Sequence, residues 1–153
     1  MKKIPAMEST RKTIPGRPSD FFIGGFWDLI AFKKADHVSK LVFELSASFP
    51  REEKYSLTDQ CRRSSRSVCA NIAEAYRKRR YPMHFVSKLS DSDTENAETQ
   101  VWLKYAFDCR YTAWEDILPI MEVSTEVGRI LGHMMDHPEK WCKSTEQPRT
   151  GSS

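Results

Sequence analysis

The sequence predicts an all-α protein, an up-down-up-down antiparallel four-helix bundle. Four segments carry apolar residues at helical spacing, and no segment shows the alternation that indicates a strand. The connections near residues 50–55 and 110–112 are short, which favours antiparallel neighbours. At 153 residues, 29% of them charged and 39% hydrophobic, the chain suits one globular domain with its own core.

The first helix is predicted over residues 27–48. One stripe at helical spacing faces the core: Trp27, Ile30, Ala31, Ala35, Val38, Leu41, Val42, Leu45 and Phe49. Leu29, Phe32 and Phe43 lie off that stripe. These three residues either form a contact with another subunit or widen the face that is buried in one bundle.

The second helix is predicted over residues 56–80. Ser56 and Asp59 have the spacing of a capping box, and Pro82 disfavours helix at Tyr81. One face is mostly apolar, and the opposite side gathers Arg62, Arg63, Arg66, Arg77 and Arg80. With Lys78 and Arg79, these residues form a candidate nucleic-acid-binding surface, because guanidinium groups suit phosphate. A solvated face that is balanced by acidic residues elsewhere is the alternative.

The charge distribution is uneven although the net charge is only +3. Residues 51–80 hold nine basic and four acidic residues, a net +5, and residues 81–136 hold four and ten, a net −6. This asymmetry favours either a nucleic-acid-binding face or contacts between basic and acidic helices.

The third helix is predicted over residues 82–109, with Phe85, Leu89, Leu103 and Phe107 on its core face. Between them on that face lie Asp93, Asn96 and Gln100. Buried polar groups need partners, so these three residues predict a polar layer in the middle of the bundle or a face that is open to solvent or ligand. Trp102 and Tyr105 point away from this face and are candidate oligomer-interface anchors.

The fourth helix is predicted to begin near Thr112, which has capping-box spacing with Glu115. Pro119 should kink this helix or shift its start. This helix carries two apolar stripes. The first, taken as the core stripe, contains Ile117, Met121, Ser124, Gly128, Leu131 and Met135. The second, assigned to an oligomer interface, contains Val123, Val127, Ile130 and Met134.

The four-helix bundle is predicted to cover residues 25–137, with a tail on either side of it. Residues 1–24 are predicted to be a disordered basic tail, and residues 138–153 a flexible tail onto which Trp141 can dock. The apolar patch at residues 21–32 is too short to span a bilayer, and no secretory signal is present. We therefore expect a cytoplasmic protein whose four cysteines are reduced.

No catalytic constellation stands out, so no enzyme activity and no cofactor are predicted. His133 and His137 are four residues apart but are expected to be a surface pair rather than metal ligands. Asp91, Asp93 and Glu95 diverge around a helix, so no metal site is expected there either.

Four segments together resemble the small bacterial four-helix bundle proteins that include the 23S rRNA-intervening sequence proteins. The segments are residues 28–35 (DLIAFKKA), 49–60 (FPREEKYSLTDQ), 62–75 (RRSSRSVCANIAEA) and 96–103 (NAETQVWL). The sequence departs from the family pattern at Ala75, where Gly is usual, and at Ala97. The resemblance covers about residues 25–136.

The resemblance implies a left-handed bundle that assembles as a ring-like homopentamer. A relative with a similar fold is the accessory variability protein of diversity-generating retroelements. That protein binds nucleic acid through a basic surface and associates with a reverse transcriptase. Two hypotheses follow for this chain. It is either a non-catalytic, homo-oligomeric RNA- or DNA-binding bundle, with the role of a reverse-transcriptase accessory factor as one form of this hypothesis, or a protein-interaction or structural bundle that binds no nucleic acid. In the second case its arginines pair with acidic helices of neighbouring subunits.

Overall fold

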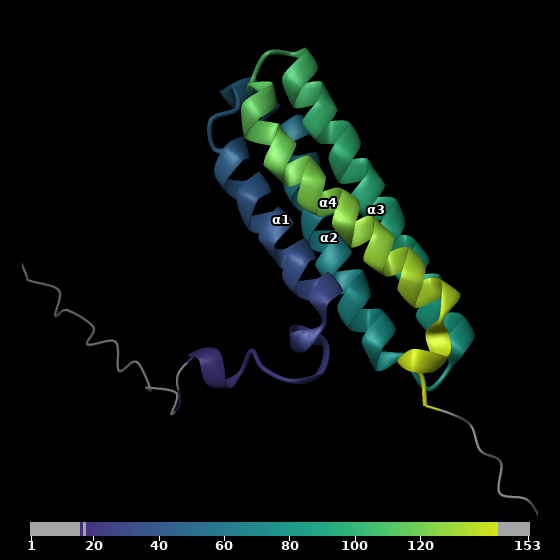
Figure 1. The fold of residues 1–153 in the computed structure, drawn as a ribbon. Helices are drawn as coiled ribbons and strands as arrows, with labels where there is room; N and C mark the ends of the chain where they lie inside the picture. Colours follow the sequence, from purple (N-terminus) through teal and green to yellow (C-terminus); the bar gives the residue numbers. More distant parts are fainter. Residues whose placement is uncertain (1–15, 17, 144–153) are drawn as a thin grey trace, which may run out of the picture.

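The structure is a computed structural model that describes residue 16 and residues 18–143. Four long helices make up most of this part (Figure 1): α1 (Ile30–Ser46), α2 (Leu57–Arg77), α3 (Pro82–Asp108) and α4 (Trp114–Asp136). Four 3₁₀ helices accompany them: η1 (Pro18–Asp20), η2 (Gly25–Asp28), η3 (Arg51–Glu53) and η4 (Pro138–Lys140). No strand occurs among the described residues, so the prediction of an all-α four-helix bundle is confirmed.

Each long helix packs against two others, in the cyclic order α1, α2, α3, α4. The backbones of the diagonal pairs, α1 with α3 and α2 with α4, do not approach each other. Short connections reverse the chain between consecutive helices, which therefore run antiparallel (Figure 1). One side of α2 consequently stays outside the bundle, between α1 and α3.

The buried side chains recur at alternating steps of three and four residues. In α3 they are Phe85, Leu89, Ser92, Asn96, Thr99, Leu103 and Ala106. In α4 they are Ile117, Ile120, Ser124, Val127, Leu131 and Met134. This spacing averages about 3.5 residues, the repeat of helices that pack along a continuous seam.

This seam corrects several predicted positions, because a wheel at 100° per residue drifts away from a 3.5-residue repeat. Phe107 was predicted in the core but is 42% exposed, and Ala106 takes its place. In α4 the seam takes members of both competing stripes. Val127 and Met134, predicted at an oligomer interface, are buried in the chain's own core, whereas Met121, Gly128 and Met135 are only half-buried.

The start of α2 is capped differently from the prediction. The Ser56 side chain makes no capping hydrogen bond to the helix; its hydroxyl donates to the Glu53 carboxylate instead. The same carboxylate accepts the Leu57 N–H at 3.0 Å and the Tyr111 hydroxyl at 3.0 Å. The predicted Ser56–Asp59 capping box is therefore wrong: Glu53 ties η3 to α2 and to the α3–α4 connection.

The predicted capping box at the start of α4 is also wrong. The helix begins at Trp114 with Ala113 as its N-cap residue, and no side chain caps it. Thr112 precedes the N-cap by one residue, and its buried hydroxyl has no hydrogen-bond partner among the described residues. Pro119 lies inside α4, in its second turn, and the helix is continuous through it.

The core consists of two apolar clusters. The cluster nearer the α2–α3 turn includes Ile72, Phe85 and Leu131, and the other includes Val42, Leu103 and Ile117. Small polar residues separate them in α2, α3 and α4. There the Ser64 and Thr99 hydroxyls lie 2.8 Å apart. The core is thus divided by a polar layer at mid-height.

The predicted tails lie partly outside the described residues, which exclude 1–15, 17 and 144–153. Of the predicted C-terminal tail, residues 138–143 are described, and Trp141 and Cys142 pack against the core cluster nearer the α2–α3 turn. Among the described residues, none of the helices is both long enough and apolar enough to cross a membrane.

Candidate nucleic-acid interface

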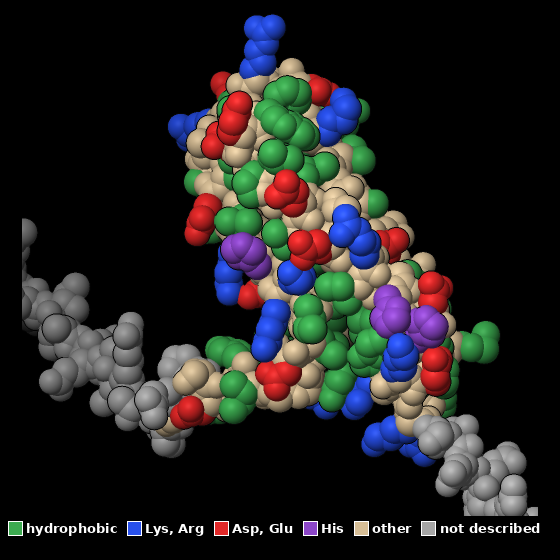
Figure 2. All heavy atoms as spheres, in the orientation of Figure 1, with side chains coloured by type: hydrophobic (Ala, Val, Ile, Leu, Met, Phe, Trp, Pro, Cys, Tyr) green, Lys and Arg blue, Asp and Glu red, His purple; other side chains and the backbone are tan. Residues whose placement is uncertain are grey.

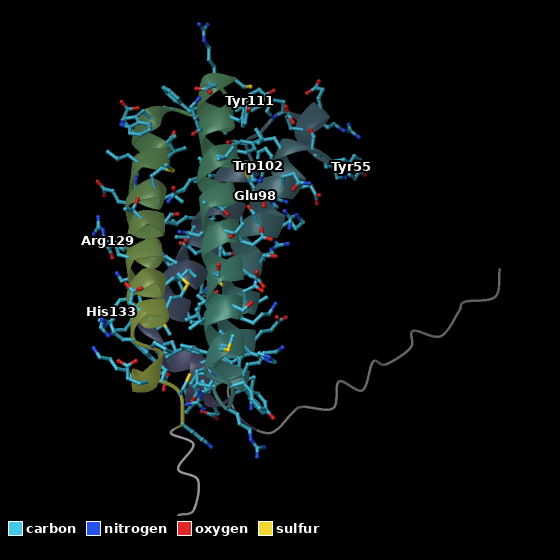
Figure 3. All side chains as sticks on the ribbon, turned by 90° about the vertical axis from the view of Figure 1, so that its right-hand side faces the viewer. Tyr55, Glu98, Trp102, Tyr111, Arg129 and His133 are labelled. Atoms are coloured by element: carbon cyan, nitrogen blue, oxygen red, sulfur yellow. The ribbon has the colours of Figure 1, made fainter. Side chains whose placement is uncertain are left out.

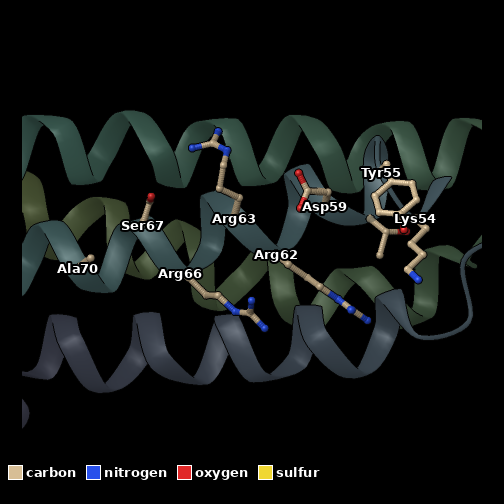
Figure 4. A pocket seen from close by; sticks show the side chains of 9 residues that line it. Lys54, Tyr55, Asp59, Arg62, Arg63, Arg66, Ser67 and Ala70 are labelled. Atoms are coloured by element: carbon tan, nitrogen blue, oxygen red, sulfur yellow. The ribbon is translucent and has the colours of Figure 1, made fainter.

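A shallow groove with a volume of about 600 Å³ follows the exposed side of α2 (Figure 4). Four basic residues contribute to its lining: Lys54, Arg62, Arg63 and Arg66. Ser67 and Ala70 line the end of the groove away from Lys54, and their small side chains leave this end open. Arg63 points toward α3, whereas Arg62 and Arg66 point toward α1 (Figure 4). The groove therefore spreads positive charge over two helix–helix boundaries.

Arg63 joins α2 to α3 within one chain. Its Nη2 donates to Glu98 Oε1 at 2.7 Å, and its Nη1 lies 3.5 Å from Glu95 Oε1. Glu98 also accepts the Trp102 indole N–H at 3.2 Å. The acidic residues that partly balance the basic face are thus, at this position, on the neighbouring helix of the same chain.

Arg62 joins α2 to α1. Its Nε donates to Ser46 Oγ at 2.8 Å, and its guanidinium carbon lies 4.6 Å from the centre of the Phe43 ring. Arg66 approaches the same ring at 6.0 Å and remains exposed. Phe43, assigned from the sequence to an oligomer interface, is 50% exposed and lies beneath two guanidinium groups.

The remaining basic residues gather where α2 ends. The helix stops at Arg77, three residues before the predicted end. Residues 78–80 form turns, and Tyr81 is extended ahead of Pro82. Arg77, Lys78 and Arg80 are exposed and have no ion-pair partner among the residues the structure describes. Lysine and arginine side chains are prominent at this lower end of the molecule in Figure 2.

Arg79 differs from its neighbours in this basic run. Its guanidinium carbon lies 3.6 Å from the centre of the Tyr76 ring, and its Nε donates to the Tyr76 carbonyl at 2.8 Å. The side chain is half-buried. Arg79 therefore shapes the turn, and the exposed charge comes from the other three residues.

The turn also holds aromatic residues that were not assigned to the site from the sequence. Tyr81 follows the basic run directly and is 56% exposed, and its ring centre lies 5.5 Å from that of His84. A tyrosine beside four consecutive basic residues was the available signal.

The residues of the predicted polar layer occupy two kinds of position. Asn96 is buried: its Nδ2 donates to the Ser124 carbonyl at 2.9 Å, and its Oδ1 accepts the Ser124 hydroxyl at 2.8 Å. Gln100 Nε2 donates to Ser124 Oγ at 2.9 Å. Asp93 is half-buried beside Gly128, and no hydrogen bond links it to Asn96 or Gln100 in the described part of the chain. Ser124 is the shared partner that the sequence had placed only on a core stripe.

The other residues assigned to an oligomer interface lie on α1, α3 and α4, except Leu29, which lies just before α1. Leu29, Phe32 and Ile130 are half-buried against the core cluster nearer the α2–α3 turn, and Trp102 and Val123 against the other cluster. Tyr105 is 51% exposed. Figure 3 places Glu98 and Trp102 on α3, and Arg129 and His133 on α4, away from Tyr55.

Two of the four cysteines are unreactive thiols, and the histidines form no metal site in the described part of the chain. Burial raises the pKa of Cys61 and Cys69 to about 12, so both remain protonated thiols near neutral pH. The His133 and His137 rings lie 4.7 Å apart. Across the described ranges, no group of three or more His, Cys, Asp or Glu residues is arranged to hold a metal ion.

Two comparisons match most of the bundle. The family model for the 23S rRNA-intervening sequence protein matches residues 27–133. A crystal structure from Bacteroides thetaiotaomicron, described as a protein of unknown function from the S23 ribosomal protein family, has 26% sequence identity and a TM-score of 0.63. That match covers 70% of this chain and 96% of the other. No curated protein matches the chain. The family match includes every basic residue of the α2 side.

Proposed function

Because the chain belongs to the family of 23S rRNA-intervening sequence proteins, we propose that it is a non-catalytic cytoplasmic protein that binds RNA through the exposed side of α2. The observation that carries this proposal is the set of exposed, unpaired basic residues on that side. Arg77, Lys78 and Arg80 stand at one end, and Arg66 stands in the groove. Unpaired guanidinium and ammonium groups bind phosphate without first giving up an ion pair.

The geometry suits a backbone that runs along α2. Arg66 and Arg77 are 11 residues apart on one helix, so their backbones are separated by about 16 Å along its axis. The groove beside Arg66 is open and shallow, as a surface that contacts a chain of phosphates would be. Binding of this kind depends on salt more than on sequence.

Charge reversal tests the proposal. The double variant Arg66→Glu/Arg77→Glu should lose most of its affinity for a short RNA at low salt, measured by fluorescence anisotropy. Arg129→Glu is the matched control, since Arg129 is exposed on α4, whose backbone does not approach that of α2. It should keep affinity close to that of the wild type. Circular dichroism should show that all variants stay helical.

Two outcomes contradict the proposal. The wild type could bind no RNA even at low salt, or Arg129→Glu could weaken binding as much as the double variant. Exposed apolar side chains, including Phe43 and Tyr105, favour the second candidate, a protein-interaction bundle. Loss of assembly in the double variant, with no RNA binding by the wild type, would support that candidate.

The proposal extends to two protein partners. The first is the chain itself in a homopentamer, which the resemblance described above favours. The second is a reverse transcriptase, by analogy with the accessory variability protein. Co-purification with a reverse transcriptase encoded beside the gene tests the second partner. If no such enzyme is encoded there, that partner is removed and the RNA-binding proposal stands.

A further inference from the structure

The α2–α3 turn combines exposed positive charge with an exposed aromatic ring. Tyr81 is 56% exposed, and it directly follows Arg77, Lys78 and Arg80 with their unpaired charges. The His84 ring lies 5.5 Å from the Tyr81 ring at an angle of 43°. The exposed Tyr81 ring therefore lies within four residues of three cationic side chains.

The backbone holds Tyr81 in place from both sides. Its N–H donates to the Lys78 carbonyl at 2.9 Å, and its own carbonyl accepts the Phe85 N–H at 3.0 Å. Pro82 fixes the first turn of α3 directly after it. The ring thus projects from an ordered turn, which reduces the entropy that is lost when a ligand stacks on it.

The charge around the turn stays positive because nearby acidic groups have other partners. Glu74 Oε2 lies 2.8 Å from Lys88 Nζ, which also pairs with Asp91. Arg79 is held against Tyr76, so it stabilises the turn rather than competing for Tyr81. Segment η4, which packs on α3 at the same end of the bundle (Figure 1), brings exposed Lys140 together with exposed Glu139 and so adds no net charge.

We propose that this turn is a stacking platform for an unpaired base, so that the RNA bound by the protein is single-stranded at this point. The inference rests on the proposed function. Bases inside a duplex are covered by their neighbours, whereas bases of a single strand expose their faces to aromatic side chains. Tyr81 supplies that face, and Arg77, Lys78 and Arg80 hold the adjacent phosphates. The basic side chains of the groove beside Arg66 bind the phosphates of either kind of strand.

The test compares single-stranded and duplex RNA of equal length with three variants. Tyr81→Ala should bind the single strand about tenfold more weakly than the wild type, because one stacked base is lost. Its affinity for the duplex and the salt dependence of its binding should not change, since no charge is removed. Tyr81→Trp should restore single-strand binding. Trp114→Ala, which removes a 46% exposed aromatic ring at the start of α4 and outside the groove, should bind like the wild type.

The outcomes separate this inference from the proposed function. If the wild type binds RNA with steep salt dependence but prefers the duplex, or if Tyr81→Ala binds the single strand like the wild type, only the stacking platform is overturned. An equal loss in Trp114→Ala would also overturn it, because stacking would then not be located at the turn. If the wild type binds neither RNA, the proposed function itself fails.

Discussion

Asn96 and Ser124 connect α3 to α4 through two hydrogen bonds inside the bundle. Gln100 adds a third bond to the Ser124 hydroxyl. Polar groups in a core are costly unless they are paired, and here each donor has an acceptor across the helix–helix boundary. At the residue scale, this pairing is what allows a polar layer to divide two apolar clusters.

Replacing Asn96 tests how much this layer contributes to stability. Asn96→Ala should lower the free energy of unfolding by about 1–3 kcal/mol, because the buried Ser124 hydroxyl loses its acceptor and the Ser124 carbonyl loses the Asn96 donor. Thr94→Ala is the control: Thr94 is exposed on the same helix, and its hydroxyl donates only to the carbonyl four residues back. Urea titration of both variants makes the comparison. Equal and small losses would show that the layer is not held by Asn96.

Glu53 gives the protein a defined response to acid. Three hydrogen bonds hold the pKa of Glu53 below its usual value of 4.5. The bond from the Ser56 hydroxyl has the largest effect, followed by those from the Leu57 N–H and the Tyr111 hydroxyl. A carboxyl group with a lowered pKa stabilises the fold above its unfolded pKa, and this contribution is lost as the pH falls through the lowered pKa. The wild type should therefore lose stability as the pH falls below the usual carboxyl range.

Glu53→Gln tests that response. Its thermal midpoint should lie below that of the wild type near neutral pH, and should fall less steeply between about pH 5 and pH 3, because the titrating group is gone. Glu52→Gln, an exposed neighbour, should keep the steepness of the wild type. Parallel curves for Glu53→Gln and the wild type would contradict the role of Glu53.

At the scale of the element, α4 contains two glycines one turn apart in different surroundings. A Cβ at Gly132 would meet no atom within 4 Å. A Cβ at Gly128 would lie 3.5 Å from Asn96 Nδ2 and 3.6 Å from Asp93 Oδ1. A Cβ at 128 would thus make ordinary van der Waals contacts with polar side chains of α3, whereas a Cβ at 132 would face open space.

Alanine at the two positions should act differently. Gly132→Ala should raise the free energy of unfolding by about 0.5–1 kcal/mol, because alanine loses less backbone entropy in a helix. Gly128→Ala should gain less, since its methyl group would displace water from the Asp93 carboxylate. Denaturant unfolding of the two variants decides. An equal gain at both positions would mean that Asp93 does not depend on the space beside Gly128.

At the scale of the whole molecule, the sequence was sufficient for the number, order and approximate bounds of the four helices. Proline and the apolar patterns mark α1 and α3 to within about three residues, which is typical of boundary assignment. The choice of core face in α4 was harder. Its two apolar stripes lie side by side, and only the packing of all four helices selects the 3.5-residue seam that joins them.

The candidate site shows the same division. The basic side of α2 can be predicted from the sequence because arginines repeat on one face. The partners of Arg62 and Arg63 could not be predicted, since Phe43, Ser46 and Glu98 come from other helices. Hence the sequence predicted the surface, and the structure separates its paired residues from Arg66, Arg77, Lys78 and Arg80.

Assembly is a further prediction at this scale. The resemblance implies a pentamer, and the exposed apolar residues, including Phe43 and Tyr105, also predict an oligomer. Light scattering should give a mass several times 17.8 kDa, with five copies as the expected number. A monomer at micromolar concentration would contradict the prediction and leave those residues as isolated surface positions.

The salt dependence of RNA binding tests the central claim most directly. If Arg66, Arg77, Lys78 and Arg80 each contact a phosphate, the logarithm of the association constant should fall with the logarithm of salt concentration with a slope of about −3 for single-stranded RNA. In Arg66→Glu/Arg77→Glu the slope should become shallower by about 1.4, and in Arg129→Glu it should not change. A wild-type slope near zero, or the same slope in all three proteins, would contradict RNA binding through the exposed side of α2.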